Sequence, residues 1–155
     1  MANLSIRFAQ KADCGLILHF IEGIAEFEKL GHLVEATIPK IKEHLFGPKA
    51  VAECLLAFEN EVAVGFALFF HNYSTFVSKP GIYLEDLFID PNHRGKGYGK
   101  ALLLNLIDLA KERNCGRVEW SVLDWNEHAI KFYESLGATP MNGWTVYRIT
   151  LSQNN

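Results

Sequence analysis

A glycine-rich segment, Arg94 to Lys100 (RGKGYGK), is the sharpest chemical signal in the sequence. It follows an apolar strand-like stretch and opens a strongly helical pattern. Glycines at such a turn let the backbone approach a ligand closely, and the first turn of the helix presents unpaired N–H groups to an anion. The cations Arg94, Lys96 and Lys100 add electrostatic attraction. The segment predicts a site for a phosphate-bearing ligand, the plain alternative being a tight turn with a glycine cap.

The spacing of the glycines narrows the class of ligand. A Walker loop requires G-x-x-x-x-G-K-[ST], which the sequence lacks, and a dinucleotide fingerprint requires G-x-G-x-x-G early in a βαβ unit. Gly95, Gly97 and Gly99 are spaced differently and lie past the middle of the chain. A nucleotide-binding P-loop is therefore disfavoured.

The pattern R-x-x-G-x-G, formed by Arg94, Gly97 and Gly99, resembles the pyrophosphate-binding signature of the GCN5-related N-acetyltransferases (GNAT). The resemblance implies acetyl-CoA as cosubstrate and an α/β fold with a mixed, mostly antiparallel sheet flanked by helices, formed as one domain over residues 1–155. It also implies that the whole turn contacts the cofactor, through Arg94, Gly95, Lys96, Gly97, Tyr98, Gly99 and Lys100. No metal is expected, because the six histidines show no ligand spacing.

Further motifs resemble the spermidine/spermine (diamine) acetyltransferase subgroup, which includes members acting on thialysine. This implies a homodimer that acetylates the primary amine of a small cationic molecule. One departure concerns Met141-Asn142, where polyamine-acetylating members carry an acidic residue just before Gly-Trp. The motifs are IAEFE at 24–28, YLEDLFI at 83–89, LDWN at 123–126, FY at 132–133, LGA at 136–138 and GW at 143–144.

Acidic residues fit this chemistry. An alkylamine with a pKa of roughly 10.4 must lose a proton before it attacks, which costs about 4 kcal/mol near neutral pH, and a carboxylate that accepts the proton lowers this barrier. Glu85, on a strand beside the cofactor site, is the candidate for this catalytic carboxylate, and by resemblance it also contacts the substrate. Glu28, Glu85 and Asp86 are expected to bind the cationic amine. Each of them taken alone is more often a surface carboxylate, and Glu119 is a weaker fourth candidate.

The leaving thiolate and the cofactor arm need partners as well. Tyr133 resembles the tyrosine general acid of the family, although its spacing on a helix alone favours core packing. Asn126 resembles a cofactor-contacting residue and is also a plausible helix N-cap. The backbone of Leu87, Phe88 and Ile89 is expected to pair with the extended cofactor arm, as an added strand pairs with a sheet edge.

The elements that must position these residues follow from hydrophobic periodicity. An antiparallel run of strands comes first and later strands alternate with helices, which predicts one mixed sheet covered by helices. Strands are expected at 4–8, 51–58, 62–71, 81–89, 117–123 and 144–151, and a loop is expected at 73–80. Helices are expected from Asp13 to about Leu30, after Thr37, from Gly97 to about Arg113 and over 126–136. Gly137 is expected to end the last of these helices.

Bulk properties set outer limits. A length of 155 residues fits one domain, and a net charge of -3 offers no basic field for nucleic acid. Cys14, Cys54 and Cys115 are scattered without metal-ligand spacing, which is typical of reduced thiols in the cytoplasm. No signal peptide is visible, and the longest apolar stretch, 62–70, is too short to span a bilayer, so no membrane association is expected.

Two alternatives remain open at this point. The substrate amine could belong to another amino acid or to a protein N-terminus, since Asn142 replaces a carboxylate. The chain could also be a non-catalytic CoA-binding module of the same fold, although the presence of both Glu85 and Tyr133 argues against that.

Overall fold

The structure is a computed structural model, and it describes residues 3–151. The chain divides into two compact units, one up to Ser121 and one from Val122 onward. The first unit contains the sheet and the glycine-rich turn, and the second contains Asn126 and Tyr133. That residues 1–155 form one domain stays a prediction.

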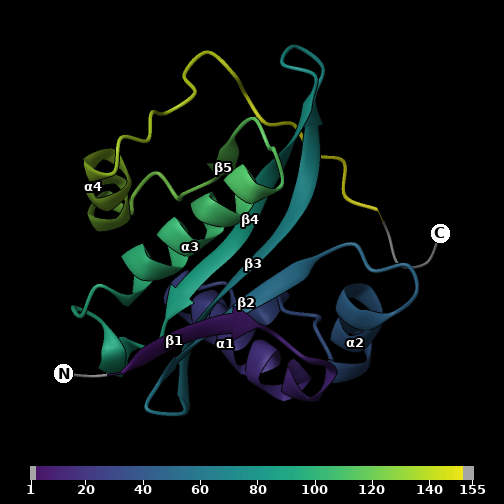
Figure 1. Ribbon diagram of the computed structural model, residues 1–155, viewed down its shortest axis with the longest axis vertical. Coiled ribbons are helices and arrows are strands. Elements are labelled where there is room, and N and C mark those ends of the chain that lie inside the picture. Colours follow the sequence, from purple (N-terminus) through teal and green to yellow (C-terminus); the bar gives the residue numbers. More distant parts are fainter. Residues whose placement is uncertain (1–2, 152–155) are drawn as a thin grey trace. The chain divides into compact units, whose positions relative to one another are not determined.

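The first unit is built on a five-stranded sheet in the order β1-β2-β3-β4-β5. Neighbouring strands pair antiparallel except β4 and β5, which are parallel, so the predicted mixed, mostly antiparallel sheet is confirmed (Figure 1). The strands are β1 (Leu4–Phe8), β2 (Glu53–Glu59), β3 (Val62–Ser74), β4 (Lys79–Ile89) and β5 (Val118–Trp120).

Helices cover both faces of this sheet. Alternate residues of β2 point to opposite faces. Cys54 and Leu56 pack in one cluster with Phe20, whereas the buried Leu55 and Ala57 face the other way. Figure 1 accordingly shows α3 on the near face and α1 on the far face. The helices of this unit are α1 (Cys14–Phe27), α2 (Ile38–Phe46) and α3 (Tyr98–Glu112), with short 3-10 turns at Lys11–Asp13, Gly31–Leu33 and Pro91–His93.

The strands expected at 51–58 and 62–71 are confirmed and form the antiparallel β2–β3 hairpin, with Asn60 and Glu61 both at positive φ in its turn. The predicted loop over 73–80 is confined to a turn at 75–78, because β3 and β4 continue pairing outward to Ser74 and Lys79. Backbone hydrogen bonds hold such a hairpin without the apolar alternation by which strands are recognised in a sequence.

The helix expected from Asp13 begins at Cys14, and the Asp13 side chain does not cap it. The Asp13 carboxylate accepts hydrogen bonds from the Arg7 side chain at 2.8 Å and from the Gln10 backbone N–H at 2.7 Å, and it therefore closes the 3-10 turn that precedes the helix. The α1 N-terminus has no side-chain cap. Thr37, by contrast, caps α2 by accepting from the Lys40 N–H at 3.3 Å.

The second unit carries α4 (Glu127–Ser135), which ends before Gly137 at φ +91° as predicted. The predicted strand over 144–151 is wrong, since these residues form no strand in the structure and Trp144 and Tyr147 are 80% and 93% exposed. Alternating apolar residues make a strand only when another strand supplies backbone partners. Likewise, the strand predicted at 117–123 is confined to Val118–Trp120.

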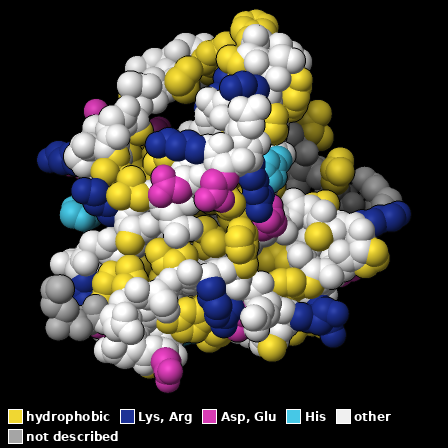
Figure 2. Space-filling model, viewed as in Figure 1, with side chains coloured by type: hydrophobic (Ala, Val, Ile, Leu, Met, Phe, Trp, Pro, Cys, Tyr) yellow, Lys and Arg dark blue, Asp and Glu magenta, His cyan; other side chains and the backbone are white. Residues whose placement is uncertain are grey.

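No helix within residues 3–151 is long and apolar enough to cross a membrane. Over the same residues no group of three or more His, Cys, Asp or Glu side chains is placed to hold a metal ion. Figure 2 shows Lys and Arg side chains scattered among acidic and apolar ones, so the face that it displays carries no continuous basic surface.

Candidate active site

The edge of β4 that faces β5 is paired over only part of its length. Parallel pairing with β5 covers Ile82 to Leu84, whereas antiparallel pairing with β3 continues to Ile89. From Glu85 to Ile89, no strand among residues 3–151 pairs with the β5-facing edge. An unpaired edge of this kind offers backbone N–H and C=O groups to an extended ligand.

Glu85 occupies a β-bulge in the middle of β4. Leu68 of β3 pairs with Asp86 and the next residue, Phe69, pairs with Leu84, which leaves Glu85 as the extra residue on β4. A bulge bends its strand and re-aims the side chain that it carries. The exposed Glu85 carboxylate thus lies where pairing with β5 stops.

The direction of the backbone groups after the bulge follows from one hydrogen bond. The Asp90 N–H donates to the Val64 carbonyl of β3 at 2.8 Å. Because alternate residues in a strand direct their backbone groups to opposite sides, Phe88 also faces β3, whereas Leu87 and Ile89 face the unpaired edge. The Phe88 backbone is thus turned away from the unpaired edge, and its buried side chain packs in the core cluster that contains Phe20.

The glycine-rich turn connects this edge to α3. Gly95 and Gly97 adopt φ of +80° and +81°, and no atom lies within 4 Å of a Cβ built on either of them. Gly97 is the N-cap of α3 and provides no side-chain acceptor to the first N–H groups of the helix. The turn therefore combines exposed donors with free space, as an anion site requires.

The cations of the turn have different surroundings. The Arg94 guanidinium lies 5.1 Å from the Phe27 ring centroid and 5.2 Å from that of Phe88. Lys96 pairs with Glu59, Nζ to Oε1 at 3.1 Å. Lys100 is exposed on the first turn of α3. The sequence reasoning missed Phe27 and Glu59, which contact the turn from distant segments.

The three predicted substrate carboxylates lie in one electrostatic neighbourhood. Burial and, after it, the nearby charges of Glu85 and Glu28 together raise the pKa of Asp86 from 3.8 to about 6. Burial also raises the pKa of Glu28, which follows the last residue of α1. Glu119 is engaged elsewhere, since it pairs with Arg117 at 3.2 Å and accepts from Asn72 at 3.2 Å.

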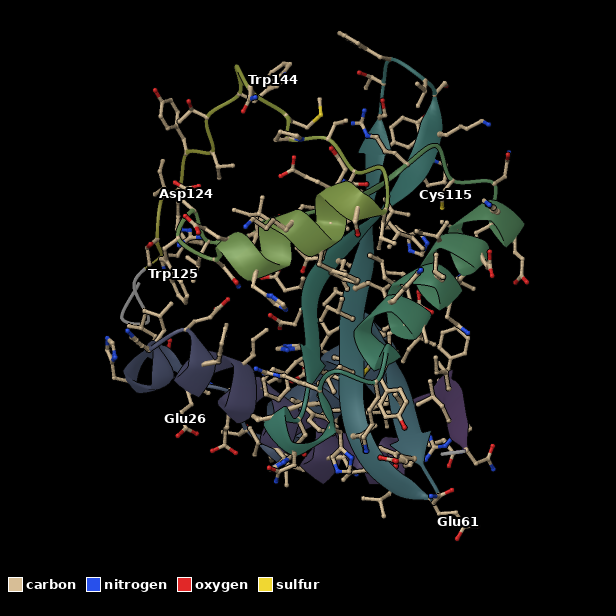
Figure 3. The ribbon with its side chains drawn as sticks, turned by 90° about the vertical axis from the view of Figure 1, so that its left-hand side faces the viewer. Glu26, Glu61, Cys115, Asp124, Trp125 and Trp144 are labelled. Carbon is tan, nitrogen blue, oxygen red and sulfur yellow. The ribbon has the colours of Figure 1, made fainter. Side chains whose placement is uncertain are left out.

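The remaining two candidates lie in the second unit. Asn126 caps α4 by accepting from the Ala129 N–H at 3.3 Å, so its expected capping role is confirmed and its cofactor contact stays a prediction. Tyr133 is half-buried on α4, with its ring centroid 5.4 Å from that of Phe132. Its approach to β4 stays a prediction. Figure 3 labels Asp124 and Trp125, which precede this helix.

Three comparisons place this geometry among known proteins. The chain is 34% identical over 159 residues to a thialysine N-epsilon-acetyltransferase of Mus musculus, covering 96% of this chain and 93% of that protein. It is 30% identical over 158 residues to a spermidine/spermine N(1)-acetyltransferase-like protein 1 of Homo sapiens, covering 96% of this chain and 23% of that protein. A solved integron cassette protein of V. cholerae superposes with a TM-score of 0.79 at 28% identity, covering 95% and 92% of the two chains.

A family model described as the acetyltransferase (GNAT) family matches residues 21–138, which include Glu28, the bulge in β4, the glycine-rich turn and α4. With the two relatives above, this match shows an acetyl-transferring enzyme of the spermidine/spermine acetyltransferase-like subgroup. The chain belongs to the acetyltransferase (GNAT) family.

Proposed function

We propose that the protein transfers an acetyl group from acetyl-CoA directly to the primary amine of a small cationic substrate, either a diamine or polyamine or a thialysine-like amino acid. The observation that carries the proposal is the cluster of three carboxylates, those of Glu28, Glu85 and Asp86. This cluster lies beside the candidate cofactor site, because Glu85 is in the β4 bulge at which the strand edge becomes unpaired. The names of the two relatives support the same class of substrate.

The residues present fit acetyl-CoA. The open backbone at Gly95 and Gly97 and the uncapped first turn of α3 suit its pyrophosphate, and Arg94 and Lys100 add positive charge. Leu87 and Ile89 direct backbone groups toward the unpaired edge, where an extended pantetheine arm would pair with them. When bound, acetyl-CoA supplies an activated acetyl thioester.

Glu85 is assigned to the substrate proton. The neutral amine attacks the thioester carbonyl carbon, and Glu85 accepts the amine proton directly or through one water. The negative charge of Glu28 and Asp86 favours an amine that arrives as a cation. Tyr133 is assigned to donate a proton to the departing thiolate, with Asn126 at the start of the same helix contacting the cofactor.

A thiol-release assay with acetyl-CoA and a panel of amines tests the proposal. The wild type should release thiol with diaminopropane, putrescine, thialysine or spermidine, and Glu85→Gln should lower kcat by roughly 10²-fold. Glu61→Gln, which makes the same change in the β2–β3 turn, should leave the rate unchanged. Activity restricted to a peptide N-terminus would overturn the assigned substrate class, and acetyl-CoA binding without turnover on any amine would indicate a binding module.

Two further features belong to the proposal. A homodimer is proposed from the resemblance to the subgroup, and light scattering at micromolar concentration should report twice the chain mass of 17.5 kDa. A monomer would refute it.

The cytoplasm is proposed as the compartment because Cys14 and Cys54 are buried free thiols.

A further inference from the structure

Glu59, the last residue of β2, contacts one residue within the glycine-rich turn and the residue that directly precedes the turn. Its Oε2 lies 2.6 Å from His93 Nδ1, and its Oε1 lies 3.1 Å from Lys96 Nζ. His93 precedes Arg94-Gly95 and Lys96 follows them, so one carboxylate bridges the two ends of this short segment. Only 13% of the Glu59 side chain is exposed, which limits the screening of both contacts by solvent.

Between these two contacts, Arg94 is held by its own hydrogen bond to the Ile89 carbonyl at 2.8 Å, whereas Gly95 has no side chain by which it could be held. Arg94 to Gly97 are exposed, and Gly95 and Gly97 are glycines at positive φ with open space around them. A glycine loses more conformational freedom on ordering than any other residue. A turn of this composition presents its N–H groups in a fixed direction only when contacts from outside hold it.

Lys96 is not a free cation, because its charge is paired. Its amine pairs with Glu59, and it lies 5.9 Å from the ring centroid of Tyr98, the first residue of α3. The hydrogen bond from Lys96 holds the pKa of the Glu59 carboxyl below its ordinary value, and the contact with His93 lowers it further. The Glu59 carboxylate is therefore charged at neutral pH, and it compensates the positive charge of Lys96.

We propose that Glu59 is a positioning residue, which through His93 and Lys96 holds the glycine-rich turn in the shape that receives the pyrophosphate of acetyl-CoA. Lys96 then acts by anchoring the turn and not by contacting phosphate. This inference rests on the proposed function, because it assumes that acetyl-CoA binds at the turn.

The direction in which Glu59→Gln changes the affinity for acetyl-CoA separates the positioning role from a purely electrostatic effect. Glu59→Gln removes a negative charge close to the proposed anion site, and Coulomb's law alone would make acetyl-CoA bind more tightly. Loss of the anchor has the opposite effect, because ordering of the turn must then occur on binding. Weaker binding after removal of a negative charge is a result that only the positioning role predicts.

Calorimetry with acetyl-CoA measures whether the Kd rises or falls. Glu59→Gln should raise the Kd for acetyl-CoA by about fivefold, with a matching rise in its KM, while kcat and the KM for the amine remain unchanged. Glu61→Gln is the matched control, since it makes the same change two residues away in the exposed hairpin turn (Figure 3), and it should leave the Kd unaltered.

A second variant tests the same role in case Glu59→Gln does not fold. His93→Ala removes the other anchor without changing any cation of the turn, and it should weaken acetyl-CoA binding by a similar factor. Urea unfolding of each variant identifies a loss of global stability. The Glu59→Gln and His93→Ala effects should not add in the double variant, because they break one network.

The outcomes are distinguishable. Wild-type protein that does not bind acetyl-CoA would overturn the proposed function itself. Wild-type binding with unchanged or tighter binding in folded Glu59→Gln would overturn the positioning role alone. If Glu59→Gln fails to fold, His93→Ala decides, and wild-type affinity in that variant also overturns the role.

Discussion

Arg94 donates a hydrogen bond from Nε to the backbone carbonyl of Ile89 at 2.8 Å, which ties the start of the glycine-rich turn to the last residue of β4. The Ile89 carbonyl lies on the unpaired edge of the strand, so Arg94 already occupies one of its acceptors. The guanidinium also lies over the rings of Phe27 and Phe88, so contacts with three residues fix its position.

Arg94→Lys should therefore not behave as a conservative change. Lysine keeps the charge but has neither the planar group that stacks on two rings nor a donor in the position of Nε. We expect acetyl-CoA to bind about tenfold more weakly, by the loss of roughly 1.4 kcal/mol. Calorimetry on Arg94→Lys and on Arg148→Lys, an exposed control in the second unit, measures the difference. Wild-type affinity in Arg94→Lys would show that charge alone is needed there.

Asp86 should make stability fall as pH rises. Its folded-state pKa is raised from 3.8 to about 6, so between these values the unfolded chain binds fewer protons than the folded one. Stability falls with rising pH wherever the unfolded state binds fewer protons. From pH 4 to pH 7 this group should lower the free energy of unfolding by on the order of 2 kcal/mol.

Urea unfolding of Asp86→Asn at both pH values measures this contribution. The variant should lose less stability than the wild type between pH 4 and pH 7. Asp108→Asn, an exposed control on α3, should follow the wild type. Parallel profiles for Asp86→Asn and wild type would show that Asp86 titrates at its ordinary pKa.

Tyr133→Phe should separate catalysis from packing. The change removes only the hydroxyl, so α4 should keep its packing, whereas kcat should fall by roughly 10²-fold or more if the hydroxyl protonates the thiolate. Tyr147→Phe makes the same change on an exposed side chain of the same unit and should leave kcat unaltered. Folded Tyr133→Phe with wild-type turnover would assign Tyr133 to packing alone.

Local patterns in the sequence predicted the parts of the site that depend on neighbouring residues. The glycine turn, the start of α3 and the Asn126 cap are of this kind, because their signals lie within one helical turn. The bulge at Glu85 was not predicted, since a bulge is defined by the register against β3. The contact between Glu59 and Lys96 joins residues 37 positions apart, and no spacing rule reaches that far.

Asn142→Asp should shift the preference among amines toward longer ones. Polyamine-acetylating members of the subgroup carry an acidic residue before Gly-Trp, and here Met141-Asn142 precedes Gly143-Trp144. We expect the wild type to acetylate short diamines or thialysine at least as well as spermine, because the far end of a long polyamine lacks a carboxylate partner. An exposed carboxylate would add about 0.2–1 kcal/mol for a second cation, which corresponds to at most about fivefold in kcat/KM.

The measurement compares kcat/KM for putrescine and spermine at fixed acetyl-CoA in wild type, Asn142→Asp and Asn114→Asp. The last variant makes the same change just beyond α3, in the first unit, and should leave the ratio of the two values as in the wild type. Only Asn142→Asp should raise the value for spermine relative to that for putrescine. A tenfold preference of the wild type for spermine would contradict the expectation, since Glu28, Glu85 and Asp86 would then suffice to hold a long polyamine.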